Sequence, residues 1–123
     1  MFDQPFILLY VASPAASADF YARLLGRDPL EASPTFAMFA LGSGVKLGLW
    51  ARHTVAPAAL AAGGGAEIGL PVPDAETVRA VHADWAARGL EIAQAPTEMD
   101  FGTTFVALDP DGHRLRVFAP GAE

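Results

Sequence analysis

The same order of predicted elements occurs twice along the chain, and this repeat constrains the fold more than any other feature. In the first half, an apolar strand-like run, a helix and further strand-like stretches are predicted at residues 6–11, 13–26, 28–32, 35–41 and 44–51. The second half repeats this order at residues 67–72, 74–89, 91–95, 102–108 and 113–119. Phe6 and Glu67 occupy equivalent positions 61 residues apart, as do Ser13 and Asp74. The sequence therefore predicts an α+β fold built from tandem βαβββ modules.

Helix-capping residues mark both predicted helices. Ser13 and Asp74 carry side-chain oxygens that accept hydrogen bonds from the free N–H groups of a first helical turn. Pro14 suits the first helical position, because its missing N–H would have no partner there. Gly26 and Gly89 follow the last helical residues, where a left-handed backbone conformation ends many helices. These signals predict where each helix of the repeat begins and ends.

Both modules are expected to form a single domain over residues 1–123, with module one at 1–51, a linker at 52–65 and module two at 66–123. The linker ends in three consecutive glycines, and its alanine-rich stretch at 58–62 permits a short helical turn. In module two, Trp85 lies at helical spacing from valines on the same helix, which predicts that it packs in the core.

Composition and charge narrow the classes of function. The chain has 123 residues, of which 52% are hydrophobic and 18% charged, as is typical of a globular protein. Its net charge of −6 and its single lysine, Lys46, argue against nucleic acid as a partner. The sequence has no apolar run long enough to span a bilayer and no basic segment before an apolar leader. We therefore expect a cytoplasmic protein without membrane contact, and the lack of cysteine excludes thiol chemistry.

Two motifs resemble those of the vicinal-oxygen-chelate superfamily, which includes glyoxalases, extradiol dioxygenases and bleomycin resistance proteins. Residues 20–26 read FYARLLG and resemble its FYxxxLG signature, and residues 108–118 read LDPDGHRLRVF and resemble its DPDGN-x-x-E-L ending. Each motif also has a purely structural explanation, as core residues of a helix and as a tight turn. With the repeat, the resemblance covers nearly the whole chain. It implies a curved, cup-shaped mixed sheet with helices on the outside, commonly in a homodimer.

The resemblance also identifies the positions at which enzymes of this superfamily hold a divalent metal. They correspond here to Phe6, Glu67 and Arg116. Phe6 offers no lone pair and Arg116 is a permanent cation, so these positions are degenerate and we expect no metal and no cofactor. Glu67 and Arg116 are expected to form an ion pair, the alternative being two separately solvated charges. The histidines share no metal-binding spacing and are expected to be structural or solvated: His53, His82 and His113.

Aromatic residues outside the helices supply the strongest indication of a ligand. A flat molecule binds by stacking between such rings. Strand alternation places Lys46, Gly48 and Trp50 on one face, with Gly48 expected to leave space beside the indole. The alternative for Trp50 is ordinary core or dimer-interface packing. Residues 96–102 are expected either to close over the ligand or to form a plain hairpin connection. The predicted ligand-binding residues are Trp50, Phe39, Phe36, Met99, Phe101, Asp100 and Tyr10.

Within the superfamily, residues 36–41, 47–50 and 99–118 resemble those of phenazine-antibiotic resistance proteins. This resemblance implies metal-independent sequestration of a planar aromatic antibiotic or metabolite, with a small molecule and a second copy of the chain as partners. We identify no catalytic residues, because no phosphate loop or nucleophile–base pair is recognisable in the sequence. A binding protein is thus favoured. The alternatives are a glyoxalase- or dioxygenase-like enzyme with atypical metal ligands or no metal, and a module without a small-molecule role.

Overall fold

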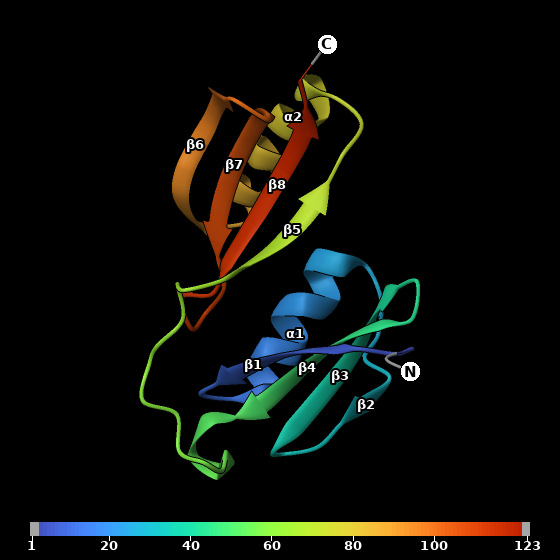
Figure 1. The fold of residues 1–123 in the computed structure, drawn as a ribbon, viewed down its shortest axis with the longest axis vertical. Helices are drawn as coiled ribbons and strands as arrows, with labels where there is room; N and C mark the ends of the chain where they lie inside the picture. The colour runs from blue at the N-terminus through green and yellow to red at the C-terminus, as the bar shows by residue number, and fades with distance from the viewer. Residues whose placement is uncertain (1–2, 122–123) are drawn as a thin grey trace. The chain divides into compact units, whose positions relative to one another are not determined.

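A computed structural model describes residues 3–121 and has the predicted tandem βαβββ order (Figure 1). The chain divides into two compact units, one ending at Ala62 and the other beginning at Gly63. This boundary falls inside the predicted linker at 52–65. Each unit holds one helix and one four-stranded mixed sheet, so the predicted α+β class is confirmed.

The N-terminal unit has a sheet with the strand order β1-β4-β3-β2. The first strand, β1, pairs in parallel with β4, whereas the other neighbours are antiparallel. A parallel pair needs a long connection, and here the connection contains the helix and the two intervening strands. The elements are β1 (Phe6–Val11), α1 (Pro14–Leu25), β2 (Glu31–Ala32), β3 (Phe36–Gly42), β4 (Val45–Ala51) and a 3₁₀ turn at Arg52–Thr54.

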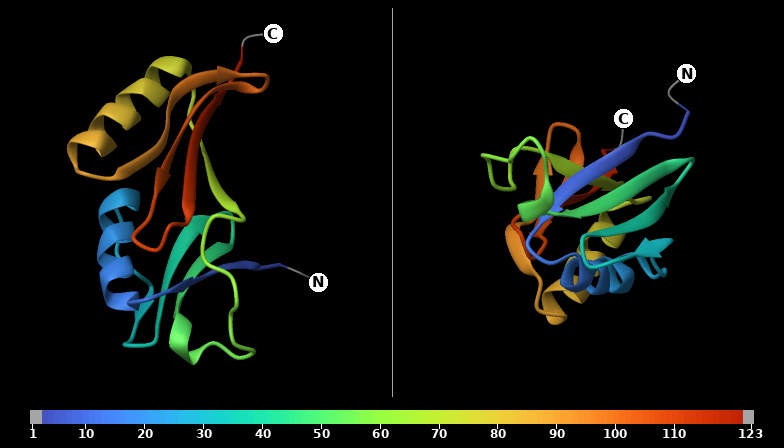
Figure 2. Two further views of the ribbon diagram at one scale, coloured as in Figure 1. Left: turned by 90° about the vertical axis from the view of Figure 1, so that its left-hand side faces the viewer. Right: turned by 90° about the horizontal axis from the view of Figure 1, so that it is seen from below.

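The C-terminal unit repeats this topology with the strand order β5-β8-β7-β6. Again the first strand pairs in parallel with the last, and the remaining pairs are antiparallel. Figure 2 shows each helix lying against one face of its own sheet, which leaves the other face of that sheet open. The elements are β5 (Glu67–Pro71), α2 (Ala75–Ala87), β6 (Glu91–Met99), β7 (Gly102–Leu108) and β8 (Arg114–Pro120).

The predicted caps begin both helices. The side-chain oxygen of Ser13 accepts a hydrogen bond from the backbone N–H of Ala16 at 3.2 Å. Asp74 Oδ1 accepts from the backbone N–H of Thr77 at 2.7 Å and from its hydroxyl at 2.6 Å. After α1, Gly26 adopts the left-handed conformation with φ of 65°. Local hydrogen-bond chemistry therefore sets the boundaries of the helices, as the sequence predicts.

Each sheet packs hydrophobic side chains against its helix. In the N-terminal unit, Leu47 and Leu49 of β4 are fully buried. In the C-terminal unit, Phe105 of β7 is fully buried beside Trp85 of α2, with ring centroids 5.4 Å apart and an interplanar angle of 79°. This edge-to-face packing confirms that Trp85 is a core residue. His82 packs on the same Phe105 ring, with ring centroids 5.3 Å apart.

The structure decides two points about the connections that the sequence left open. Residues 58–62 contain no helical turn, and a 3₁₀ turn occurs earlier, at Arg52–Thr54. Strand β6 continues to Met99, so most of the segment 96–102 belongs to the hairpin with β7, which is the second of the two predicted alternatives. Among the described residues, neither helix has the length and apolar character needed to cross a bilayer.

Candidate functional site

Three aromatic side chains lie in one row across the open face of the N-terminal sheet. In the strand register, Tyr10 of β1 and Phe36 of β3 both pair with Trp50 of β4. All three side chains are half-buried, whereas their neighbours on the opposite face are covered by α1. The rings of Tyr10 and Trp50 meet edge to face, with centroids 6.1 Å apart and an interplanar angle of 81°. We call Tyr10, Trp50 and Phe36 the aromatic row.

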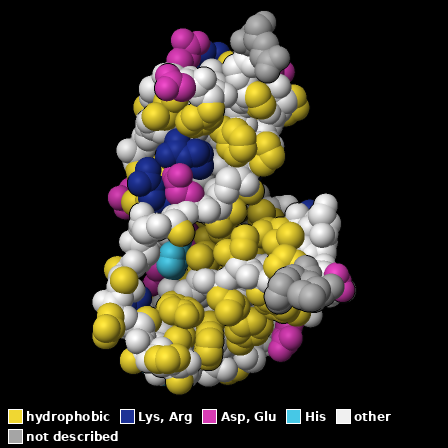
Figure 3. All heavy atoms as spheres, viewed as in Figure 1, with side chains coloured by type: hydrophobic (Ala, Val, Ile, Leu, Met, Phe, Trp, Pro, Cys, Tyr) yellow, Lys and Arg dark blue, Asp and Glu magenta, His cyan; other side chains and the backbone are white. Residues whose placement is uncertain are grey.

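A second row next to the aromatic row is aliphatic and has a glycine at its centre. Leu8 and Met38 both pair with Gly48 of β4. A Cβ atom built on Gly48 would lie 2.6 Å from Leu8 Cδ2 and 3.0 Å from Phe36 Cζ. The expected free space beside Trp50 is therefore filled, because these side chains lie directly over the strand backbone. Figure 3 shows hydrophobic side chains gathered over β1, β3 and β4.

Phe39 does not belong to this surface, which corrects the prediction that it contacts a ligand. Its side chain is fully buried. Phe39 pairs with Leu47, which is also buried, and strand alternation places it on the face opposite Phe36. It therefore packs in the core on the side of α1.

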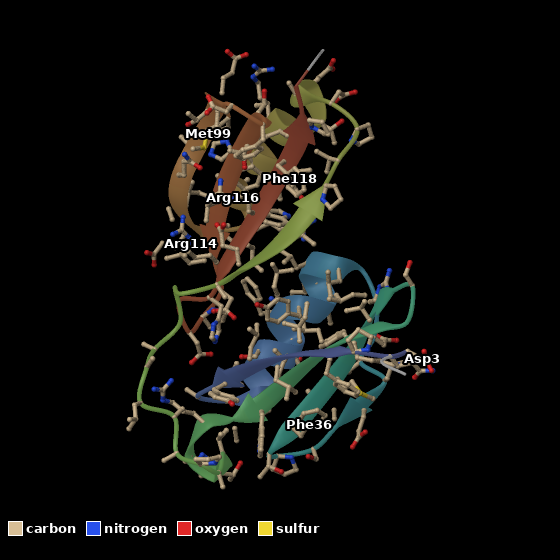
Figure 4. The ribbon with its side chains drawn as sticks, viewed as in Figure 1. Asp3, Phe36, Met99, Arg114, Arg116 and Phe118 are labelled. Atoms are coloured by element: carbon tan, nitrogen blue, oxygen red, sulfur yellow. The ribbon has the colours of Figure 1, made fainter. Side chains whose placement is uncertain are left out.

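On the open face of the C-terminal sheet, Arg116 and Glu67 form the predicted ion pair. Arg116 Nε lies 3.0 Å from each carboxylate oxygen of Glu67, and Arg116 Nη2 lies 2.9 Å from Oε2. Arg114 also approaches this carboxylate, with its Nε 3.5 Å from Oε2. We call Glu67, Arg114 and Arg116 the charged cluster. Figure 4 shows Arg114, Arg116 and Phe118 following one another along β8.

Two polar side chains fix the remaining donors of Arg116. Its Nη1 donates to Gln94 Oε1 and to Thr104 Oγ1, each at 3.2 Å. The buried Thr104 hydroxyl donates in turn to the backbone carbonyl of Val117 at 2.9 Å. Because the guanidinium group bonds to three strands besides its own, its position is set by the sheet, and only 18% of the side chain is exposed.

The charged cluster lowers the pKa of Glu67 below its ordinary value of 4.5. The hydrogen bonds from Arg116 are the main cause, burial opposes them, and the positive charges of Arg116 and Arg114 add to the lowering. The folded protein therefore binds fewer protons here than the unfolded chain, so the contribution of Glu67 to stability is present above about pH 4.5 and is lost as the pH falls through the folded pKa.

Replacing Glu67 by glutamine is expected to reduce this pH dependence. A third of the side chain is exposed, so solvent screening limits the expected loss near neutral pH to about 1 kcal/mol. Urea unfolding of both proteins at pH 7 and at pH 3.5 provides the measurement. The difference in unfolding free energy between the two proteins should shrink at the lower pH, and a difference independent of pH would contradict an ionised Glu67.

Hydrophobic side chains border the charged cluster at the β6–β7 turn. Phe101 is 47% exposed, and its ring lies 6.0 Å from Arg116 Cζ and 6.2 Å from the ring of Phe118. Met99 contacts the cluster indirectly, because its sulfur accepts from Gln94 Nε2 at 3.6 Å. Asp100 lies exposed at the turn itself. Of the predicted ligand-binding residues, Phe101 thus lies beside Arg116, and Met99 is linked to it through Gln94.

Several residues beside Arg116 were missed at the level of sequence. Arg114 and Phe118 lie two positions before and after Arg116 on β8, so strand alternation places them on its face. Gln94 and Thr104 give no comparable local signal, because their position depends on the pairing of β6, β7 and β8.

The residues at the positions that correspond to metal ligands do not fit a divalent cation. Phe6 has no donor atom, and Arg116 places a positive charge where a cation would bind. Both carboxylate oxygens of Glu67 already accept hydrogen bonds from that guanidinium group. Between residues 3 and 121, no three His, Cys, Asp or Glu side chains gather closely enough to hold a metal ion.

Comparisons with known proteins agree with the topology and with the motifs. A family model described as the glyoxalase/bleomycin resistance protein/dioxygenase superfamily matches residues 4–117. The phenazine antibiotic resistance protein EhpR of Enterobacter agglomerans is 27% identical over 113 residues, which cover 89% of this chain and 86% of that protein.

Solved structures share the fold. A protein of Agrobacterium tumefaciens, determined by solution NMR, is 51% identical with a TM-score of 0.87, over 95% of this chain and 96% of its own. A glyoxalase-related enzyme of Fulvimarina pelagi is 20% identical with a TM-score of 0.83, over 97% of this chain and 88% of its own, and supports the fold alone. Because the family model matches residues 4–117, which is most of the chain, the chain belongs to the glyoxalase/bleomycin resistance protein/dioxygenase superfamily.

Proposed function

We propose that this protein binds a planar aromatic antibiotic or metabolite without a metal ion and thereby sequesters it. The observation that carries this proposal is the aromatic row, in which Tyr10, Trp50 and Phe36 share one register position on adjacent strands. The similarity to a phenazine antibiotic resistance protein supports the same class of ligand. We include in the proposal a homodimer, which the superfamily resemblance implies, and a cytoplasmic location, which is expected from the absence of an apolar span or leader in the sequence.

The aromatic row suits a flat ligand on physical grounds. Its side chains are half-buried, so each ring is held by its neighbours while part of its surface remains accessible. Aromatic contacts contribute about 0.5–1.5 kcal/mol each beyond the area they bury. Such contacts need no metal ion, and the chemistry of Phe6 and Arg116 does not offer one a site.

Calorimetric titration with phenazine, in the presence of a chelator, tests the proposal. We expect saturable binding to the wild-type protein. Replacing Trp50 by leucine should weaken the affinity about five- to tenfold, because one aromatic contact is lost. The matched control is the substitution of Trp50 by phenylalanine, which keeps a ring and should retain most of the affinity.

Three other outcomes would contradict the proposal in different ways. Equal affinities of the Trp50→Leu and Trp50→Phe variants for phenazine would show that the aromatic row is not part of the binding surface. Binding only after addition of a divalent ion would mean that the protein depends on a metal. Chemical conversion of the ligand, detected by chromatography of the titrated sample, would favour the enzyme alternative.

A further inference from the structure

We propose that Arg114 makes the open face of the C-terminal sheet a binding site for an aromatic carboxylate. The proposal does not depend on the aromatic row, since every residue that carries it lies in the C-terminal unit, on its strands or at the β6–β7 turn. The argument has three parts: an excess of positive charge, the uncommitted donors of Arg114, and the aromatic side chains on the same face.

The charged cluster has more positive than negative charge. It combines Arg114 and Arg116 with the one carboxylate of Glu67, and the pKa of Glu67 is lowered, so that carboxylate is ionised at neutral pH. Both of its oxygens already accept hydrogen bonds from Arg116. The Glu67 carboxylate, which Arg114 also approaches, is therefore largely neutralised by Arg116. One unit of positive charge in the cluster remains for a further anion.

Arg114 and Arg116 differ in how their donors are used. Arg116 donates to Glu67, Gln94 and Thr104, and its guanidinium group also lies beside the ring of Phe101. Arg114 reaches Glu67 only through Nε at 3.5 Å, and that nitrogen is buried without a hydrogen-bond acceptor. Among the described residues, Glu67 alone lies within ion-pair distance of Arg114.

The side chain of Arg114 is accessible to a ligand, although its Nε is buried. Its side chain is 38% exposed, about twice the 18% exposure of Arg116. A guanidinium group with free Nη donors binds a carboxylate through two parallel hydrogen bonds. Arg114 is therefore the residue of the charged cluster that can receive a carboxylate without first losing a partner.

Aromatic side chains follow Arg114 along the same face. Phe118 is four residues further on β8, about 13 Å away at the rise of a strand, and the guanidinium group of Arg116 lies between them. Phe101 packs edge to face on Phe118 and is half exposed. A ligand with a carboxylate at Arg114 would thus extend its ring over Arg116 towards Phe101. This arrangement selects an aromatic acid over a neutral compound of the same shape.

The test compares 2-naphthoate with 2-naphthamide, which have the same shape and differ in charge. We expect calorimetric titration of the full-length protein to give an affinity about tenfold higher for naphthoate. In a ¹⁵N-labelled sample, naphthoate should shift the backbone amide signals of β5 and β8. Higher salt concentration should reduce the preference, because part of it is an interaction between charges.

Replacing Arg114 by glutamine should abolish the preference for naphthoate while the affinity for naphthamide stays unchanged. The matched control is Arg88→Gln on α2, which removes an exposed arginine paired with Asp84 at 2.9 Å on the helix. This control should keep the preference. Circular dichroism of each variant establishes that it is folded.

Equal affinities of the wild-type protein for the two probes, or a preference that survives Arg114→Gln, would overturn the proposal. The titration of neutral phenazine against the Trp50 variants does not involve Arg114. The two proposals can therefore fail separately, since one is measured by the loss of an aromatic ring and the other by the loss of a charge preference.

Discussion

Replacing Gly102 by alanine is expected to lower the free energy of unfolding by about 3 kcal/mol or more. Gly102 begins β7 with φ of 139°, a conformation that side chains with a Cβ rarely adopt. A Cβ atom there would overlap the carbonyl oxygen of Ala119 and lie 2.7 Å from the backbone nitrogen of Gly121. Both obstacles are backbone atoms of or next to β8, so relief would require the β7–β8 pairing to shift.

Gly26→Ala provides a matched control for this substitution. Gly26 also has positive φ, at 65°, but no atom lies within 4 Å of its added Cβ. It therefore reports only the backbone cost, about 1 kcal/mol. Urea unfolding of the two variants measures the difference, which combines the steric overlap at Gly102 with the higher backbone cost of its φ of 139°. Equal losses of stability would show that the end of β8 moves aside at no cost.

Replacing Phe105 by alanine is expected to cost about 3–5 kcal/mol of unfolding free energy. Its ring is fully buried, and its centroid lies 5.4 Å from that of the Trp85 ring and 5.3 Å from that of the His82 ring. The substitution therefore leaves a cavity between β7 and α2. The loss combines the transfer of the ring to water in the unfolded state with the contacts that surrounding atoms no longer make.

Chemical unfolding followed by circular dichroism measures this loss. Phe101→Ala is the control, since that ring is about half exposed and its removal leaves no enclosed cavity. We expect the control to lose less than about 1 kcal/mol. Similar losses for both variants would contradict the assignment of Phe105 to the core.

The repeat and the helix caps could be predicted because their causes are local in sequence. Ser13 and Asp74 bond to N–H groups three residues later, so no knowledge of the tertiary structure is needed. The ion pair of Glu67 and Arg116 was also predictable, since the resemblance places both side chains on neighbouring strands. Its partners Gln94 and Thr104 were not, because their positions depend on how three strands pair.

The errors at the aromatic face have physical reasons. Phe36 and Phe39 are three residues apart on one strand, and an odd separation places two side chains on opposite faces. The prediction that both contact a ligand overlooked this alternation. At Gly48, a missing side chain was interpreted as open space, whereas Leu8 and Phe36 occupy it. A sequence shows where a side chain is absent, but the neighbours that fill its place belong to other strands.

The packing over Gly48 also affects how this surface can change in evolution. Leu8 is 45% exposed and Phe36 is half-buried, so the outer surface here consists of side chains that rest on a glycine rather than on a packed core. A substitution at Leu8 alters the contour of the surface, while the hydrogen bonds between β1 and β4 involve only the backbone. Substitutions at position 8 can therefore change the shape of this surface without rebuilding the sheet, provided that residue 48 remains glycine.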